Sequence, residues 1–264
     1  MKFVSRVVSF SLFSLVAGSA IAADLPEPVI EHVPVIPAAS SSGWYLRGDI
    51  GYKIYKAPKT TYSDSIIFEG EEQDPTGIIG AGVGYRFNEH LRTDVTVDYE
   101  WPSDFDGRVD CLTNCGTGPG IAQSVETASL DVWTILWNVY ADLGNYRGFT
   151  PYVGAGIGAS YVSYDDIRYV NPNGAEGGYP SDGKWNFSWA AMAGVGYAIT
   201  PSWHLDAGYR YLWIGDGKSA NFSSNGVNDH IKYEDLAAHE FRVGLRYEFG
   251  QQNAFAPGPV VATY

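Results

Sequence analysis

The segment Glu240-Phe-Arg-Val-Gly-Leu-Arg-Tyr-Glu-Phe249 decides the fold of this chain. Its apolar and aromatic residues occupy every second position, and charged residues or glycine occupy the positions between them. Successive side chains of a β-strand point to opposite faces, so this strand has one apolar face and one charged or bare face. Soluble proteins also contain single strands of this kind. Recurrence of the pattern, aromatic residues at strand ends and an export signal together predict a transmembrane β-barrel.

Seven further segments alternate in the same way. With the first, the predicted strands are 43–55, 77–87, 91–101, about 126–143, 150–164, 185–199, 202–214 and 240–249. The connections 88–90, 144–148 and 200–201 are short, whereas 56–76, 102–125, 165–184 and 215–236 are long. This layout is typical of outer-membrane barrels. We therefore predict an all-β fold: an eight-stranded antiparallel transmembrane β-barrel with short periplasmic turns and four long extracellular loops.

The N-terminus has the features of a cleaved signal peptide, residues 1–22. Lys2 and Arg6 precede an apolar run, and Ala20-Ile-Ala22 is a small-residue cleavage site. The run is shorter than the ~20 residues of a spanning helix, and no other stretch of the chain reaches that length. We expect residues 23–42 to form a Pro-rich periplasmic leader, 43–249 the barrel, and 250–264 a C-terminal periplasmic tail. The predicted location is the bacterial cell outer membrane.

The chain is acidic. It has 17 Lys and Arg against 30 Asp and Glu, and removal of Lys2 and Arg6 leaves (17 − 2) − 30 = −15. Binding of nucleic acid requires clustered basic residues, so nucleic acid is excluded as a partner.

Two cysteines, Cys111 and Cys115, lie close together in one long connection. An oxidising compartment favours a local disulfide between them. A metal site would need further Cys or His ligands, and none is near in sequence. A metal site and free thiols remain the alternatives.

The apolar face of each strand is expected to face lipid, because a closed barrel satisfies the backbone hydrogen bonds that a lipid environment requires. The predicted interface aromatics at strand ends are Trp44, Tyr85, Trp101, Trp185, Tyr197, Trp203, Trp213, Tyr247 and Phe249. A lipocalin-like soluble barrel with the opposite polarity is the alternative. The even strand layout, the interface aromatics and the terminal Tyr-Glu-Phe favour the membrane barrel.

The inward face carries seven cations and eight anions, with His204 alongside. The predicted polar network of the lumen contains Arg47, Asp49, Arg86, Arg92, Asp94, Asp98, Glu100, His204, Asp206, Arg210, Glu240, Arg242, Arg246 and Glu248, together with Lys53 and Asp142. An isolated buried charge is costly, so this balance indicates pairing. The interior of an eight-stranded barrel is only wide enough for side chains. We therefore predict a filled lumen, in which inward glycines make room for long arginines.

Four stretches carry a resemblance to a known family: Ala22-Ala-Asp-Leu-Pro-Glu-Pro28, Gly80-Ala-Gly-Val-Gly-Tyr-Arg-Phe87, Thr150-Pro-Tyr-Val-Gly-Ala-Gly-Ile-Gly158 and Phe241-Arg-Val-Gly-Leu-Arg-Tyr-Glu-Phe249. The chain resembles the small outer-membrane barrels of alphaproteobacteria, the opacity-like or OmpA-transmembrane-like porin family, over nearly all of 43–249. The resemblance implies an abundant surface protein that supports envelope integrity and host interaction, without catalytic residues. Family members commonly end on the last strand's aromatic residue, whereas this chain continues past Phe249.

The expected partners are outer-membrane lipid and lipopolysaccharide, the barrel-assembly machinery, and a host-surface ligand bound through the long loops. Two other functions stay open: a narrow ion-conducting channel, and an outer-membrane lipid-modifying enzyme. No nucleophile and base can be named among the residues, so we assign no catalytic residues. The glycines of 80–84 and 154–158 keep period two and do not form a nucleotide-binding G-x-G-x-x-G. The acidic loops indicate either a solvated surface or a site for divalent cations or a ligand, and haem capture by His230 rests on one residue. We expect no cofactor and no metal.

Overall fold

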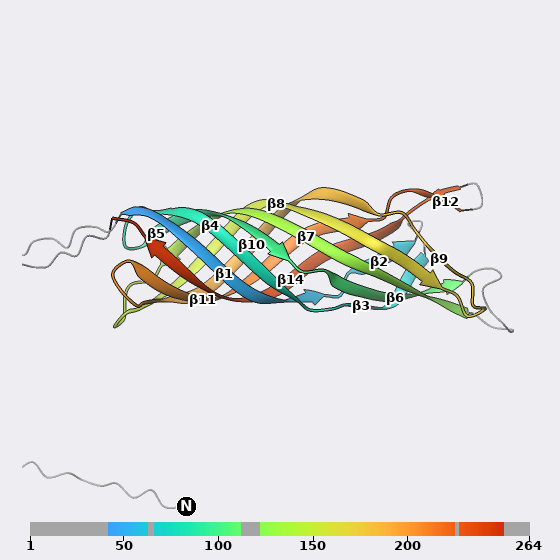
Figure 1. Cartoon of the computed structure of the whole chain (residues 1–264), viewed down its shortest axis with the longest axis horizontal. Coiled ribbons are helices and arrows are strands. Elements are labelled where there is room, and N and C mark those ends of the chain that lie inside the picture. Colours follow the sequence, from blue (N-terminus) through green and yellow to red (C-terminus); the bar gives the residue numbers. More distant parts are fainter. Residues whose placement is uncertain (1–41, 63–65, 112–121, 225–226, 251–264) are drawn as a thin grey trace, which may run out of the picture. The chain divides into compact units, whose positions relative to one another are not determined.

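A computed structural model describes residues 42–62, 66–111, 122–224 and 227–250. Eight antiparallel strands form a closed ring, in which β14 pairs with β1. They are β1 (Gly43–Lys56), β4 (Thr76–Arg86), β5 (Leu91–Glu100), β7 (Ala122–Asp142), β8 (Phe149–Val170), β10 (Asp182–Ala198), β11 (Trp203–Lys218) and β14 (Ile231–Glu248) (Figure 1). The predicted eight-stranded barrel is confirmed. The predicted signal peptide lies outside the described residues, as do the leader and the tail apart from Ser42 and Gly250.

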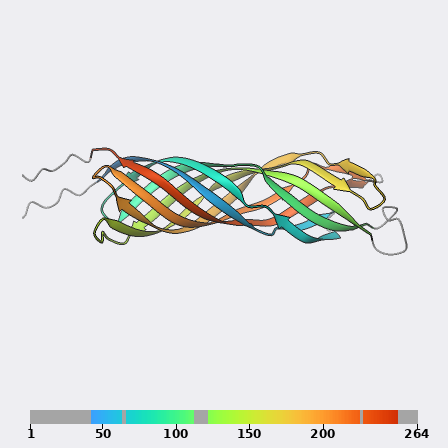
Figure 2. The ribbon, with the colours of Figure 1, turned by 60° about the horizontal axis from the view of Figure 1, so that its bottom comes forward.

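The register fixes the tilt of the strands. Starting at Tyr45 on β1, the residue paired with it on each successive strand leads around the ring to Ala238 on β14. Ala238 pairs with Tyr55, so one circuit of the ring ends 55 − 45 = 10 residues farther along β1. With about 3.3 Å per residue along a strand and about 4.8 Å between strands, this shift tilts the strands by about 40° from the barrel axis. Figure 2 shows the strands winding obliquely. Eight strands at this tilt enclose an interior that side chains can fill.

Local side-chain bonds shape the short turns. The Asn88 carboxamide oxygen accepts the backbone N–H of His90 and of Leu91. The Thr200 hydroxyl does the same for Ser202 and Trp203. These bonds replace ladder hydrogen bonds where the chain reverses. The three short connections lie where the sequence predicts them.

The long connections lie at the expected positions, but much of their length is strand rather than loop. They contain β2 (Lys59–Tyr62), β3 (Ile66–Gln73), β6 (Ser103–Cys111), β9 (Glu176–Gly178), β12 (Phe222–Ser224) and β13 (Val227–Asp229). β6 pairs with β7 and β3, and β2 pairs with β3 and β14. These strands continue the barrel wall where β1, β4 and β5 have ended. We call β2, β3 and β6, with 122–132, 162–170, 214–218 and 231–238, the distal zone, and the rest of the ring the proximal zone.

Prolines mark the step between the two zones. Pro58 separates β1 from β2, Pro75 separates β3 from β4, and Pro102 separates β5 from β6. Proline has no N–H to give to the ladder, so it interrupts each strand. Beside Pro102, a backbone hydrogen bond continues the pairing of β4 with β5: the Trp101 N–H donates to the Gly77 carbonyl at 3.1 Å. β7, β8 and β14 run through both zones without such a break.

The interiors of the two zones differ. The distal zone is filled by an apolar core of which the fully buried members include Phe68, Phe105, Leu130, Ile167 and Ile231. The proximal zone is filled mainly by charged and polar side chains, although Leu136, Ala190 and Leu212 in it also belong to the buried apolar core. This apolar core was not predicted from the sequence, because most of the distal zone was expected to be loop. The described residues contain no helix that is long and apolar enough to span a membrane.

Candidate functional site: the charged interior and the aromatic exterior

Two arginines and three carboxylates form the centre of the proximal interior. Arg242 donates to Asp49 at 2.6 Å, to Asp98 at 2.5 Å and to Glu240 at 3.1 Å. Arg210 donates to Asp98 at 2.8 Å and to Glu240 at 2.6 Å. All five residues are at least nine-tenths buried. Each guanidinium therefore bridges carboxylates from different strands, which ties the ring together across its interior.

A second group lies toward the short turns. Glu248 accepts from Arg86 and from Arg246, each at 2.6 Å. Arg246 also donates to Asp206 at 3.0 Å. The His204 ring nitrogen Nε2 lies 3.6 Å from the Glu248 carboxylate without a hydrogen bond. Beside this group, Arg92 donates to Asp142 at 3.0 Å, and Asp142 lies 3.6 Å from Arg86.

A third group joins charges to tyrosines. Arg47 lies between Asp49 and Asp94, at 3.0 and 3.2 Å, and donates to the Tyr140 hydroxyl at 2.9 Å. The Tyr45 hydroxyl donates to Asp94 at 3.0 Å. Four further members of the interior were not predicted as part of the network: Tyr45, Tyr140, Tyr152 and Asn138. Their parity on the strands, which matches that of the charged residues, was the available signal.

Arg92 also contacts the tyrosine rings. Its guanidinium lies 4.1 Å from the ring centre of Tyr140 and 4.7 Å from that of Tyr152. A guanidinium on an aromatic face gains electrostatic energy that increases when the pair is desolvated. Inward glycines make room for these rings: a methyl group at Gly84 would lie 2.3 Å from the Tyr45 ring. The expected room for arginines is thus shared with tyrosines.

Lys53 lies where the charged interior meets the apolar core. It pairs with Glu100, and its Nζ lies 3.3 Å from Glu240. The Tyr55 hydroxyl donates to Glu100 at 2.5 Å. The structure therefore brings all fifteen charged residues singled out from the sequence into one connected interior, with His204 at its edge.

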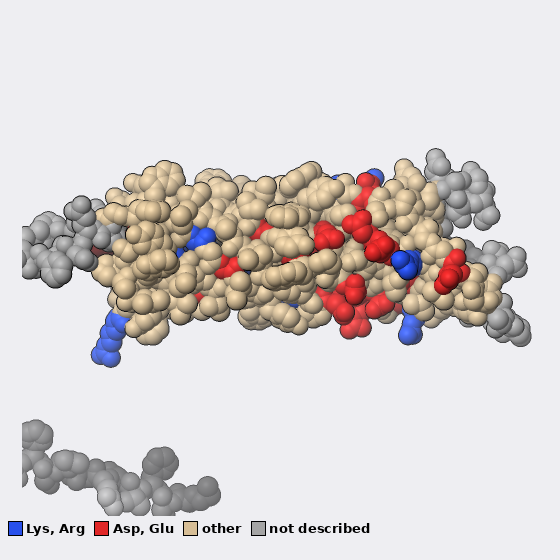
Figure 3. All heavy atoms as spheres, viewed as in Figure 1, with Lys and Arg blue, Asp and Glu red and all other residues tan. Residues whose placement is uncertain are grey.

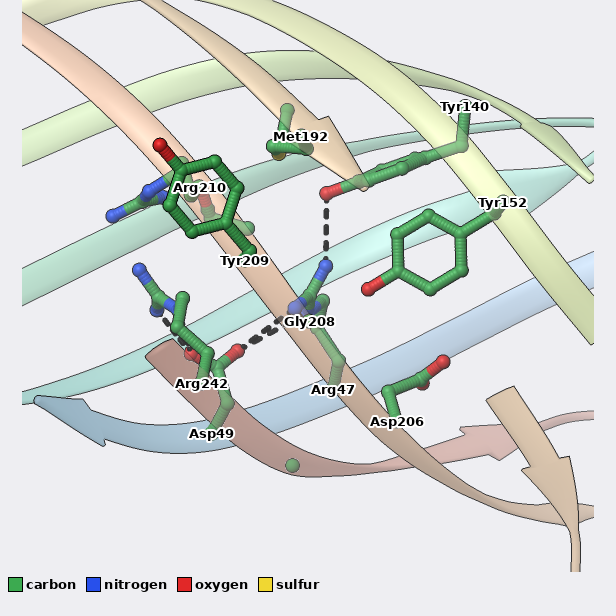
Figure 4. Close-up of a pocket in the computed structure, with 12 residues that line it drawn as sticks. Arg47, Asp49, Tyr140, Tyr152, Met192, Asp206, Gly208, Tyr209, Arg210 and Arg242 are labelled. Carbon is green, nitrogen blue, oxygen red and sulfur yellow. Dashed lines mark hydrogen bonds and ion pairs between the residues drawn. The ribbon is translucent and has the colours of Figure 1, made fainter. Parts of the chain in front are cut away.

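The central cavity of this interior is small. Its volume is about 20 Å³, and Arg47, Asp49, Tyr140, Asp206 and Arg242 are among its lining residues. Figure 4 shows Asp49 bonded to both Arg47 and Arg242, and Tyr140 bonded to Arg47, around this space. A cavity of this volume has room for about one water molecule.

The exterior of the proximal zone is aromatic at both ends. Toward the short turns, Trp44 contacts Tyr85 and Trp203 contacts Tyr247, with ring centres 5.4 and 4.9 Å apart. Tyr197 and Phe249 are exposed at the same end. Trp101, Trp185 and Trp213 lie at the border with the distal zone, where Trp133 joins them.

The apolar band between the two aromatic girdles has the height of a membrane. On β11, Trp203 and Trp213 are ten residues apart. At the tilt given above, this spacing corresponds to about 25 Å along the barrel axis. In Figure 3, carboxylates gather toward the end of the molecule that contains β3 and β6. The outward residues Glu69, Glu72, Asp104 and Asp106 are exposed there.

Cys111 ends β6, and nothing is described of its side chain, while Cys115 lies outside the described residues. The disulfide therefore stays a prediction. Within the described part of the chain, no group of three or more His, Cys, Asp or Glu residues could hold a metal ion.

The chain is similar in sequence to a family of outer-membrane proteins and to several individual bacterial proteins. The family described as "Outer membrane protein beta-barrel domain" matches residues 10–249. An uncharacterised protein of Brucella abortus is 34% identical, with 88% of this chain and 93% of the relative covered. The outer membrane protein PagN of Salmonella typhimurium is 27% identical, with 80% and 92% covered. A Rickettsia bellii protein named "Putative adhesin" is 26% identical, with 79% and 89% covered.

Proposed function

Because the chain belongs to the outer membrane protein beta-barrel domain family, we propose that it is a structural barrel of the bacterial outer membrane that supports the envelope and makes surface contacts through its distal zone. In this placement the apolar band between the aromatic girdles crosses the membrane. The short turns face the periplasm, and the distal zone stands outside the cell.

The closed interior carries the structural part of the proposal. The charges of the proximal zone neutralise one another at hydrogen-bond distances, and the central cavity has a volume of about 20 Å³. Above it, Leu130, Ile214 and Ile231 belong to an apolar core without exposed surface. An ion that entered from either end would have to break buried ion pairs and cross an apolar layer, and both steps are costly. These features support a filled barrel over the alternative of a narrow ion channel.

The distal zone supports the surface-contact part of the proposal. Its wall of paired strands carries exposed side chains beyond the membrane, among them the carboxylates of β3 and β6. The Rickettsia bellii relative named "Putative adhesin" aligns with 79% of the chain. We infer the same kind of role for this chain, through contacts on paired strands of the distal zone.

The first experiment tests the barrel and its interior. The purified, folded full-length protein should show β-sheet circular dichroism and should migrate differently on gels before and after heating. In planar bilayers it should show no steady conductance on the nanosiemens scale. Steady conductance would overturn the filled interior, while absence of heat-dependent migration would overturn the barrel itself.

The second experiment tests surface contact. Expression of the chain in a non-adherent bacterium should increase attachment to cultured host cells. A variant with Glu72→Gln and Asp104→Asn in the distal zone should attach less than the wild type at equal surface amount. The matched control is Glu89→Gln, which neutralises an exposed carboxylate in a short turn. Equal attachment by bacteria with and without the chain would refute the adhesin role.

A further inference from the structure

His239 is exceptional on the lipid-facing surface. It points outward from β14 and is exposed, one position inside the distal girdle. At the other outward positions of the described strands between the girdles, the residues are apolar, aromatic, Gly, Pro or Thr. An ionisable side chain in such a band is a candidate functional residue because its burial in lipid is costly.

Neighbouring tyrosines hold the imidazole in place. The Tyr209 hydroxyl lies 2.7 Å from His239 Nδ1. Tyr211, the cross-strand partner of His239, packs edge-on against the ring at 5.5 Å between centres. When Nδ1 accepts from the Tyr209 hydroxyl, the neutral imidazole carries its proton on Nε2. A protonated imidazole carries a proton on each nitrogen, so that Nδ1 donates to the Tyr209 oxygen and Nε2 is again an N–H donor. In both states an N–H donor is directed away from Tyr209.

This N–H donor needs a partner from the surroundings. Among the described residues, none bonds to His239 Nε2. An unpaired donor in hydrocarbon costs several kcal/mol, on the order of a lost hydrogen bond. The Trp213–Ala237 pair lies two residues farther toward the distal end than the Tyr211–His239 pair. His239 is therefore at the depth where headgroup oxygens meet acyl chains.

Lys56 provides a positive charge beside this donor. Ile54 is paired with His239 on β1, and Lys56 lies two residues farther on the same face. Such a diagonal neighbour is about 7–8 Å away between Cα atoms. Lys56 is exposed and has no ion pair among the described residues, whereas Lys59 pairs with Asp235 at 3.8 Å. The Lys56 charge is thus available to an anion.

From this arrangement we propose that Lys56, Tyr209 and His239 form a binding site for the phosphate group of an outer-leaflet lipid. The ammonium of Lys56 and the N–H of His239 donate to phosphate oxygens, and such charge-assisted bonds are the strong ones. The exposed side chains of Tyr52 and Phe241, nearer the middle of the band, receive the acyl chains. The inference rests on the membrane placement proposed above.

Native mass spectrometry of the purified, folded full-length protein tests the site. The probes are bisphosphorylated lipid A, the same lipid with both phosphates removed, and inorganic phosphate. We expect the phosphorylated lipid to bind at least about tenfold more tightly than the dephosphorylated one. Inorganic phosphate should not compete, because it lacks the acyl chains.

Substitutions locate the binding. His239→Phe and Lys56→Gln should each weaken binding of the phosphorylated lipid about tenfold. Tyr209→Phe should weaken it less, because it removes only the hydrogen bond that orients the His239 imidazole. The matched controls are His90→Phe in a short turn and Lys59→Gln in the distal zone, which should bind like the wild type.

Two outcomes would overturn the site: equal binding of the two lipids by the wild type, or unchanged binding by His239→Phe. Should His239→Phe fail to fold, unchanged binding by Lys56→Gln and Tyr209→Phe together would overturn it. Heat-dependent gel migration of the same samples is measured in parallel. Its loss in the wild type would refute the membrane barrel rather than the lipid site alone.

Discussion

At the scale of single residues, Arg242 shows how the barrel keeps charges in its interior. Its guanidinium contacts Asp49, Asp98 and Glu240, which come from three different strands. Removal of one member of a buried ion pair leaves an uncompensated charge, and this costs more than the pair itself contributes.

Arg242→Met is therefore expected to lower the free energy of unfolding by about 3–5 kcal/mol. Urea unfolding in lipid vesicles, followed by heat-dependent gel migration, measures the change. Arg168→Met is the control, because the Arg168 side chain is 71% exposed and its ion pair with Asp166 is at the surface. The control should change stability by less than about 1 kcal/mol. Equal losses in both variants would contradict the buried network.

Glu126 is a buried carboxyl of a different kind, because no cation among the described residues forms an ion pair with it. It lies on β7 within the distal zone with 3% of its surface exposed, and its Oε2 has no hydrogen-bond partner in the part of the chain that the structure describes. Burial raises the pKa of this carboxyl from 4.5 to about 8. The protonated form is thus favoured in the folded state at neutral pH.

The sign of the pH effect follows from this shift. As pH rises from about 4.5 to 8, the unfolded chain releases this proton before the folded chain does, so stability falls; above pH 8 the loss is complete. The full difference corresponds to roughly 5 kcal/mol as an upper limit. In urea unfolding at pH 5 and pH 8, Glu126→Gln should lose this part of the pH dependence. Glu72→Gln, an exposed control, should keep it, and an unchanged pH profile for Glu126→Gln would refute the assignment.

At the scale of elements, β7 shows why the barrel has two zones. Its inward residues change from Ala128, Leu130 and Val132 to Asn138, Tyr140 and Asp142. Its outward residues change from Thr127, Ser129 and Asp131 to Trp133, Ile135 and Trp137. The alternation keeps its phase while its polarity inverts near Trp133. An apolar interior suits a wall in water, and an apolar exterior suits a wall in lipid.

Phe105→Ala should loosen the distal zone and leave the ring folded. The Phe105 ring is fully buried and packs edge-on against Tyr233, with ring centres 5.1 Å apart. Its truncation is expected to cost about 3–5 kcal/mol locally. Hydrogen exchange should show lost protection in β3 and β6 but not in β10. Phe187→Ala is the control, since Phe187 is 61% exposed on the outer face. Loss of protection throughout the ring would contradict independent zones.

The ring could be predicted because alternation, strand count and short turns all depend on local sequence. The charged residues could be assigned to the interior for the same reason. Their partners could not, because Arg242 and Asp49 are 193 residues apart and meet only through the tilt and register of the closed ring. The distal strands were missed because Pro75 and Pro102 interrupt the alternation at the step, and because their carboxylates resemble those of loops. The inverted polarity of β7 is visible in the sequence, and it could have indicated the apolar interior of the distal zone.

At the scale of the whole molecule, the proposed orientation places the two ends of the barrel in different compartments. Thr127→Cys puts a thiol on the exposed face of the distal zone, and Glu89→Cys puts one in a short turn. A membrane-impermeant maleimide should label Thr127→Cys in intact cells and Glu89→Cys only after the outer membrane is permeabilised. The wild type, with Cys111 and Cys115, is the control for background labelling. The reverse pattern would invert the orientation.

The continuity of β7, β8 and β14 through both zones has a mechanical consequence. A pull on the outer end of the molecule is transmitted along these strands into the ring, where the strands are tilted by about 40° from the barrel axis and paired on both sides, so that a large part of the load acts along them. Ladder hydrogen bonds loaded along the strand direction share the force and resist together, unlike bonds opened one at a time at a free edge. We expect the barrel to resist unfolding when force is applied to its distal zone, as attachment in a flowing liquid would require.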